Sequence, residues 1–433
     1  MNLATPTTDL LHHYHAALLE HHSMMTHPLH GLSNQLNKDF DVSKWPTTRH
    51  EEWKYTSLKA LSQIEFSLEA SSDSKKLKSY LESLLFYHTE AHHLVFVNGL
   101  FHSELSRLIP GAEKTVSSTY VHASLIPEQL AKVIGISSPA ERDELRKLNN
   151  MVLHDGLSIQ LPKGQTATQV YVYQLIDSEQ PFAVHSRNLI HLAENAECKV
   201  VEHFAAFGNK SHWFNPTTEI QIDAHARLEY CLLQTQSDVG FFTGLSYLRQ
   251  SDSSQLSHHT ISTGGRLIRN NLDLILDGSH IESHMNGLYM LTDDTLVDNH
   301  TLVDHQRPHS NSNEFYKGIM DGKSCGVFNG KIFVRQAAQK TNAFQSNRNI
   351  VLSPDASVYT KPQLEIFADD VKCSHGATSG QLDEESIFYL RSRGLSHAQA
   401  KALLTKAFAG EIVERIPQPE LRAYIEQQID QRF

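Results

Sequence analysis

The chain has 433 residues, of which 40% are hydrophobic and 20% charged, an ordinary balance for a folded soluble protein of two or three domains. Its 38 basic and 49 acidic side chains give a net charge of −11, which argues against a dedicated binder of nucleic acid or anionic membranes. No stretch approaches the roughly 18 apolar residues of a membrane helix. The first residues do not read as a signal peptide and the four cysteines form no CxxC pair, so we expect a cytoplasmic protein without disulfides.

Residues 1–150 are predicted to form a mainly helical N-terminal region. Apolar residues recur at helical spacing over residues 10–18, and a second short amphipathic run covers residues 75–86. Residues 93–97 have the composition of a strand and end in an Asn-Gly turn, and a further helix is expected near residues 141–148.

Residues 151–382 are predicted to be an all-β unit. Short apolar alternations such as 169–173 and 272–276 are separated by turns rich in Asp, Gly, Ala and Ser, and no long helical pattern interrupts them. The turns recur about every 25 to 32 residues, which is typical of a parallel β-helix with small residues at its corners. A β-sandwich or jelly roll is the open alternative. The turns in question are centred on Ala196, Ala226, Ser254, Ser279, Ser324 and Ala356.

Residues 383–433 are predicted to return to helix. The acidic residues 383–385 suit the first turn of a helix that ends at Gly394. Ser396 and Gln399 form a capping box, after which apolar residues recur at helical spacing until two prolines interrupt them. The apolar stripe has two open interpretations, a cap on the end of the β-helix and a docking surface, and both can hold because one helix face can pack inward and another outward.

One short motif has the residues for metal chemistry. Cys373 and His375 lie two residues apart in an extended segment, so their side chains share a face. A thiolate and an imidazole suit iron or zinc, and the adjacent Lys372 is expected to favour the thiolate. Two ligands leave such a site incomplete, because zinc and iron–sulfur sites usually have four donors. A buried structural cysteine beside a satisfied histidine is the competing interpretation.

Other polar groups give weaker signals. His300, His305 and His309, with Asp304, have metal-binding chemistry, but no single regular element brings them to one side. The 28 histidines include clumps without a shared spacing. The favoured interpretation, surface drift, is that these histidines accumulated on the surface without a function. The sequence has no GxSxG motif, no P-loop and no GxGxxG after a strand, and its adjacent acid pairs fit turns better than glycoside chemistry.

The chain resembles the SufB/SufD family of iron–sulfur cluster assembly proteins over three long passages, 304–322, 330–353 and 362–395, the last of which reads PQLEIFADDVKCSHGATSGQLDEESIFYLRSRGL. Near the N-terminus, RHEEWKYTSL at residues 49–58 is similar to the SufD branch. The SufB branch has a cysteine in the stretch that matches residues 347–353, which here reads NRNIVLS. The resemblance therefore points to the SufD branch.

This resemblance implies a right-handed parallel β-helix flanked by N-terminal and C-terminal helical regions. It also implies a non-catalytic subunit of a SufBCD-type complex that assembles nascent iron–sulfur clusters. The expected partners are a SufB-like subunit, paired side by side, and a SufC-like ABC-type ATPase that hydrolyses the ATP, with a homodimer possible when the chain is alone. The cluster is expected to be transient and shared, with no tightly bound cofactor.

The resemblance assigns His375 to the shared cluster site, where a SufB-like subunit supplies the thiolate and the imidazole completes the iron coordination. Cys373 is the weaker candidate, and Asp304, His305 and His309 match the family pattern without an assigned role. Residues 383–433 become the ATPase-docking region, in which aromatic and arginine residues are favoured anchors. The expected docking residues are Phe388, Tyr389, Arg391, Arg393 and Gly394.

Two functions of other classes stay open at the level of sequence. A β-helix hydrolase or lyase acting on acidic polysaccharide would need secretion and a groove lined with carboxylates and arginines. A stand-alone metal-binding protein would use the histidine-rich segments.

Overall fold

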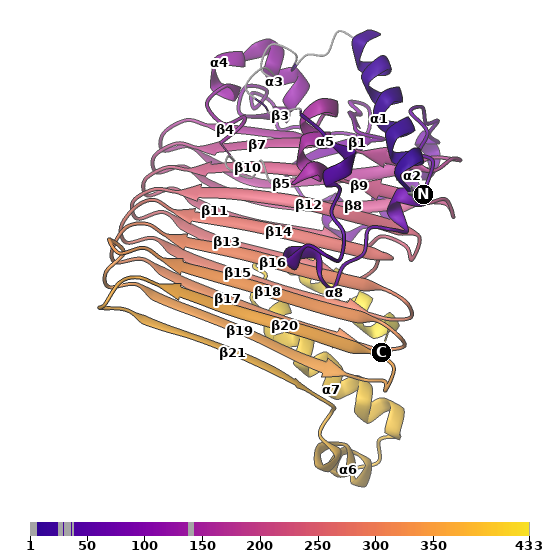
Figure 1. Ribbon diagram of the computed structural model, residues 1–433, viewed down its shortest axis with the longest axis vertical. Helices are drawn as coiled ribbons and strands as arrows, with labels where there is room; N and C mark the ends of the chain where they lie inside the picture. The colour runs from indigo at the N-terminus through magenta and orange to yellow at the C-terminus, as the bar shows by residue number, and fades with distance from the viewer. Residues whose placement is uncertain (1–6, 25–28, 30–35, 37–38, 137–142, 433) are drawn as a thin grey trace, which may run out of the picture.

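The computed structural model describes residues 7–24, 29, 36, 39–136 and 143–432 (Figure 1). Its strands stack into a long solenoid, with the N-terminal helices at one end and α6 beyond the other (Figure 1). Two sheets line this stack.

The first sheet has ten strands, and the second has eleven. In spatial order the first contains β2 (Leu100–Phe101), β1 (His92–Val97), β5 (Thr166–Asp177), β8 (Glu197–Phe207), β11 (Arg227–Gln234), β13 (Gln255–Ser262), β15 (Glu282–Leu291), β17 (Asn311–Met320), β19 (Asn342–Val351) and β21 (Lys372–Gly380). The second contains β20 (Ser357–Ile366), β18 (Cys325–Val334), β16 (Leu296–His305), β14 (Leu267–Leu276), β12 (Gly240–Gln250), β10 (Thr217–Ile222), β7 (Arg187–Leu192), β4 (Leu157–Leu161) and β3 (Val116–Ser118), with β6 (Phe182–Val184) and β9 (His212–Phe214) at its side.

Strands of successive coils pair in parallel and in register. Gln255 of β13 pairs with Glu282 of β15, 27 residues later, and Asn311 of β17 pairs with Asn342 of β19, 31 residues later. The apolar side chains that face inward form one continuous core along the stack. The predicted parallel β-helix is confirmed, and the alternative of an antiparallel sandwich or jelly roll is wrong.

The corners of the coils combine a small buried residue with a left-handed residue before it. Of the small residues that the sequence singled out, Ala196, Ala226, Ser254 and Ser324 are buried, whereas Ser279 and Ala356 are half-buried. A left-handed conformation costs an L-residue roughly 1–2 kcal/mol, but it lets the corner N–H bond to the next coil, as Asn195 N does to Ala224 O at 3.0 Å. The corner pairs include Asn195-Ala196, His225-Ala226, Ser253-Ser254 and His309-Ser310.

The N-terminal region contains the predicted helices and also contributes strands to the solenoid. β1 pairs in parallel with β5, so the first sheet begins before residue 151. Apolar residues of this region pack with Trp213 and Phe241 beside the second sheet. The helices are α1 (Thr7–Met24), α2 (Ser74–Ser83), α3 (Thr119–Leu125), α4 (Pro127–Leu130) and α5 (Glu144–Val152), with 3-10 turns at Val42–Lys44, Glu51–Trp53, Leu61–Gln63 and Leu85–His88.

Residues 51–56 form a strap across the outer face of the second sheet. Arg269 of β14 donates to the carbonyl oxygen of Glu52 at 2.8 Å, and its guanidinium lies 4.3 Å from the centre of a Trp53 ring. The Tyr55 ring stacks on Tyr359 of β20 at 4.3 Å. Since β14 and β20 belong to different coils, the strap ties the last coil to earlier ones.

The C-terminal helices are α6 (Glu384–Ser392), α7 (His397–Val413) and α8 (Pro419–Arg432). The predicted capping box of Ser396 and Gln399 is confirmed. Apolar residues of α7 and α8 pack against the outer face of the first sheet. Lys317 of β17 fixes α7 there, since its buried ammonium donates to Phe408 O at 2.8 Å and lies 2.9 Å from Glu411. The helices therefore cover a side of the solenoid, and the interpretation that they cap its end does not hold.

A buried ion pair joins α5 to the first coils of the second sheet. Arg187 and Glu219 are both fully buried, and Arg187 Nη2 lies 2.5 Å from Glu219 Oε2. The same guanidinium donates to Asn149 and Asn150 of α5, at 3.2 and 2.8 Å. This arginine therefore fixes the N-terminal region onto the solenoid.

Replacing Arg187 with Met is expected to destabilise the protein by about 3 kcal/mol or more, because it leaves the Glu219 carboxylate buried without its main partner. The midpoint of denaturant unfolding measures the loss. The exposed pair Lys163–Glu194 gives the control, and Lys163→Met should leave that midpoint unchanged. Equal midpoints for Arg187→Met and the wild type would contradict the assignment.

Candidate functional site

The last coil of the solenoid leaves one edge open on each sheet. Within the described residues, β20 pairs only with β18 and β21 only with β19. Side chains of both strands are half-buried or exposed, whereas those of β17 are almost all buried. Unpaired strand edges beside uncovered apolar side chains favour association with another chain. The exposed apolar residues at this end are Phe344, Tyr359, Ile366 and Phe367.

Cys373 and His375 lie on β21 and face the inside of the solenoid. Cys373 packs against the inner core, and His375 shares its face because side chains two apart on a strand point the same way. The His375 side chain is exposed, since no further coil covers it. The predicted shared face is therefore present, on the last coil, where the inward-facing side chain of His375 is open to solvent.

The expected help of Lys372 to the Cys373 thiolate is wrong. Burial raises the pKa of the Cys373 thiol, and Lys372, one residue away on the strand, points to the opposite face. Cys198 and Cys231 are fully buried, and burial raises the pKa of each thiol to about 12. All four cysteines are free. Of the two candidates, the side chain of His375 is the more exposed.

Behind His375, a row of polar side chains continues into the solenoid. Strand register places His375 beside Gln345 of β19, and Gln345 beside Glu314 of β17. Gln345 and Glu314 are buried, and Gln345 Nε2 donates to Glu314 Oε2. Burial raises the pKa of the Glu314 carboxyl to about 7, although hydrogen bonds from Thr301 and Gln345 oppose that shift.

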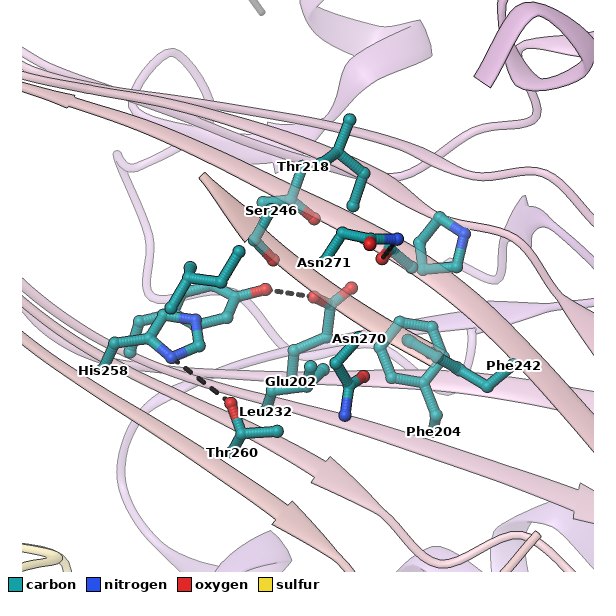
Figure 2. Close-up of a pocket in the computed structure, with 15 residues that line it drawn as sticks. Glu202, Phe204, Thr218, Leu232, Phe242, Ser246, His258, Thr260, Asn270 and Asn271 are labelled. Carbon is teal, nitrogen blue, oxygen red and sulfur yellow. Dashed lines mark hydrogen bonds between the residues drawn. The ribbon is translucent and has the colours of Figure 1, made fainter. Parts of the chain in front are cut away.

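A second polar group lies deeper inside the solenoid (Figure 2). Glu202 accepts hydrogen bonds from Tyr230 and, at 2.7 Å, from Asn188, and burial raises the pKa of its carboxyl. His258 lies 3.5 Å from Thr260 in the same lumen (Figure 2). Sequence reasoning missed both inner groups, because alternation predicts an apolar side chain at every inward position. The available signal was a polar residue at that parity, as in Glu314 two residues before Tyr316.

The three spaced histidines point in three directions. His300 faces the outer side of β16, with its ring nitrogens 3.4 Å from Glu52 and 3.0 Å from Asp298. His305 faces inward, 2.8 Å from Ser312, and burial lowers its pKa to about 4. His309 is an exposed corner residue. A metal site that joins them is excluded by this geometry. Asp304 forms a two-point ion pair with Arg335, at 2.8 and 3.0 Å, and His309 stacks on His280.

The histidine clumps are mostly structural where the structure describes them. His92 and His93 are buried, as are His258 and His259, so surface drift is wrong for these two clumps. Burial lowers the pKa of His93 and of His259 to about 4. The side chains of His12, His21 and His22 lie outside the described residues. In the part of the chain that the structure describes, no three His, Cys, Asp or Glu side chains gather as a metal site.

The helix α6 exposes the aromatic residues that the sequence singled out. Ile387 is buried, whereas Phe388 is 72% and Tyr389 57% exposed. The Arg393 guanidinium lies 5.3 Å from the centre of the Tyr389 ring, and Arg391 is exposed on the same helix. Gly394 follows with a φ of 97°, as expected of a residue that ends a helix. The predicted docking residues are therefore exposed, on or directly after a helix that lies beyond the last coil (Figure 1).

A cleft of about 850 Å³ lies between residues 44–53, α5 and the outer face of the second sheet. Its two arginines are engaged within the protein, Arg269 with Asp298 and Arg335 with Asp304. The groove of available arginines that a polysaccharide enzyme predicts is therefore not found in this cleft. No helix among the described residues is long and apolar enough to cross a membrane.

Replacing Glu314 with Gln should change how stability depends on pH. The folded pKa of Glu314 lies above the value of 4.5 expected when the chain is unfolded, so wild-type stability is lost as pH rises from about 4.5 through 7. Gln has no proton to lose, so the stability of the variant relative to the wild type should rise by about 3 kcal/mol between pH 4 and pH 8.

Urea unfolding at several pH values measures this difference. The exposed Glu282 of β15 provides a matched control, since Glu282→Gln should show a flat difference over the same range. A flat difference for Glu314→Gln as well would mean that Glu314 is ionised in the folded protein at neutral pH.

Comparisons with known proteins agree with this architecture. A family model for the SufBD core domain of SUF-system iron–sulfur cluster assembly matches residues 174–408, and one for the SufBD N-terminal region matches residues 3–171. The iron–sulfur cluster assembly protein SufD of Escherichia coli is 30% identical over 90% of this chain and 89% of its own length.

Two further relatives are similar over most of their length. A SufBD family protein of Synechocystis is 33% identical over 88% of this chain and 86% of its own. The chloroplastic protein ABCI7 of Arabidopsis thaliana is 28% identical over 91% of this chain and 84% of its own. With both family models matched along a parallel β-helix, the chain belongs to the SufB/SufD family of iron–sulfur cluster assembly proteins, on its SufD branch.

Proposed function

We propose that the chain is the SufD-like, non-catalytic subunit of a SufBCD-type complex that builds nascent iron–sulfur clusters. It pairs through the open end of its solenoid with a SufB-like subunit and docks a SufC-like ATPase on α6. The observation that supports this most is His375, an imidazole on the inner face of a coil that nothing covers. Family membership supports a role in cluster assembly, and the uncovered last coil supports the proposed location of the cluster.

The proposed partner surface is the edge of β20 and β21. Both strands offer backbone groups that a neighbouring strand can pair with, and exposed Phe344 and Phe367 add apolar area beside them. Edge-to-edge pairing of two solenoids would satisfy those groups and cover the apolar residues. A second copy of this chain has the same edges, so a homodimer is the expected state when the SufB-like subunit is missing.

The proposed role of His375 is to lend one ligand to a cluster assembled at this junction. Thiolates usually hold iron–sulfur clusters, and a histidine ligand on iron is known to raise the potential of such centres. The thiol of Cys373 is hindered by its raised pKa, so most of the thiolate ligands must come from the partner. The cluster is cargo that must leave the complex. Ligands that come from two subunits can separate when the cluster is released.

The proposed route from ATP to this junction begins at α6 and continues through α7. The buried ammonium of Lys317 links α7 to β17 by its contacts with Phe408 and Glu411. β17 is two strands from β21 in the same sheet. Motion of a docked ATPase would therefore act on β17. This strand pairs with β19, which in turn pairs with the strand that contains His375. The chain has no P-loop, so the proposal assigns hydrolysis to the ATPase.

The proposed compartment is a reducing one. Four free cysteines suit the cytoplasm, and the Arabidopsis relative is named as chloroplastic.

The first test replaces His375 with Ala in the reconstituted complex. Cluster yield, measured by visible absorption and by bound iron and sulfide, should fall several-fold, because one iron loses its ligand. Cys373→Ser should have the smaller effect. ATPase binding should stay unchanged in both variants. An unchanged cluster yield for His375→Ala would remove this residue from the mechanism.

A second test separates the two docking surfaces. Phe388→Asp should weaken ATPase binding by about ten-fold or more, because it places a charge in the centre of an aromatic anchor. It should leave pairing with the SufB-like subunit unchanged. Phe367→Asp, at the open end, should give the reverse pattern, so each variant controls for the folding of the other. Native mass spectrometry of the mixed subunits reads both outcomes, and loss of the same partner in both variants would contradict the assignment.

A further inference from the structure

A ligating imidazole needs a partner for its second nitrogen. Metal-bound histidines almost always donate their other ring N–H to a carboxylate, carbonyl or water, which fixes the tautomer and the ring orientation. Among the described residues, no side chain forms a hydrogen bond with the imidazole of His375. Its neighbour in strand register is Gln345 of β19, and adjacent strands lie about 4.8 Å apart. A glutamine side chain at that spacing can reach the imidazole.

Gln345 is buried, and only one end of its side-chain amide forms a hydrogen bond. Its Nε2 donates to Glu314 Oε2, while its Oε1 is buried without a hydrogen-bond partner. At pH 8, above its pKa of about 7, Glu314 is mainly a carboxylate and only accepts hydrogen bonds, so it turns the NH₂ end of the amide toward itself and the oxygen away. Glycine at position 330 makes room for this arrangement, because a Cβ there would lie 1.9 Å from Gln345 Nε2.

The unpartnered oxygen of Gln345 indicates a missing hydrogen-bond donor beside it. Buried polar atoms are nearly always hydrogen-bonded, and one without a partner has lost water without a replacement. His375 lies on the open strand, where its side chain is free to rotate about Cα–Cβ. A rotamer of His375 that brings a ring N–H within hydrogen-bond distance of Gln345 Oε1 would satisfy both groups.

We propose that Gln345 is a positioning residue for His375: its Oε1 accepts the N–H of one ring nitrogen, which leaves the other nitrogen unprotonated and turned toward the cluster junction. Glu314 acts one step further back, by holding the amide of Gln345 in the accepting orientation. The inference deepens the proposed function, on which the metal-ligating role of His375 rests. The hydrogen bond itself involves only residues of this chain.

The test reads the tautomer of His375 directly. Long-range ¹H–¹⁵N correlation spectra of the deuterated full chain, with ¹⁵N-labelled histidine, distinguish the two neutral tautomers at pH 8. The signal is assigned by its loss in His375→Ala. In the wild type one tautomer of His375 should dominate, in contrast to the exposed corner residue His225, which serves as the internal reference for a solvated ring.

Two variants carry the test. Gln345→Leu should bring the tautomer ratio of His375 to that of His225. The swapped double variant, Glu314→Gln with Gln345→Glu, should restore the dominant tautomer, because Gln at 314 donates to Glu at 345 and leaves an oxygen for the imidazole. The control is Gln250→Leu, which removes a buried glutamine bonded to Ser254 and Ser283 in earlier coils. It should leave the His375 signal as in the wild type.

Mixed tautomers of His375 in the wild type would overturn the proposal, and so would a dominant tautomer that survives Gln345→Leu. If that variant does not fold, the swapped double variant decides, since a ratio like that of His225 there contradicts the proposal. In the reconstituted complex, Gln345→Leu should lower cluster yield about ten-fold. A tautomer effect without any effect of His375→Ala on yield would confirm the hydrogen bond and reject the metal-ligating role.

Discussion

Parallel stacking of in-register strands is the constraint on which the rest of this structure depends. Each strand of a β-solenoid satisfies its backbone groups with the coil before and the coil after it, so the stack cannot close on itself. At the start, the N-terminal region covers the first coils, and Arg187 fixes that cover in place. At the other end, the C-terminal helices turn back along a side face and leave β20 and β21 open. A neighbouring chain is the natural cover for that end.

The same constraint explains why the proposed cluster ligand lies on the last coil. Most inward positions of the earlier coils are buried, and a charged or ligating group there is costly unless it is hydrogen-bonded. At β21 of the last coil, the inward side chain of His375 reaches solvent while buried neighbours lie beside it in register. His375 occupies that position, with Gln345 and then Glu314 behind it. The fold therefore gives an edge residue a preorganised set of buried supports, which a loop on the surface could not do.

Much of the architecture could be predicted from local sequence rules. Some features depend only on residues that are close in the chain, so the sequence predicts them. They include corner residues such as Ala226, the capping box of Ser396 and the alternation within strands. The strap and the ion pair of Lys317 with Glu411 are not, because they join segments about 90 to 300 residues apart. The alternation of side chains along a strand also determines which way the spaced histidines point. His300 and His305 are five residues apart on one strand and must face opposite sides, a consequence that required the strand boundaries to be known. The polar inner rows were missed because alternation predicts an apolar side chain at every inward position, and these positions are polar.

The central claim is that the open end of this solenoid is completed by a second, cysteine-bearing β-helix subunit while α6 holds an ATPase. The most direct measurement is an anaerobic pull-down of the intact tagged chain from its own cells, with the co-purifying proteins identified by mass spectrometry. The account predicts recovery of both an ABC-type ATPase and a second SufB/SufD-family subunit that has the cysteine missing from residues 347–353 here. Recovery of neither protein, from cells in which the chain is abundant and folded, would contradict it.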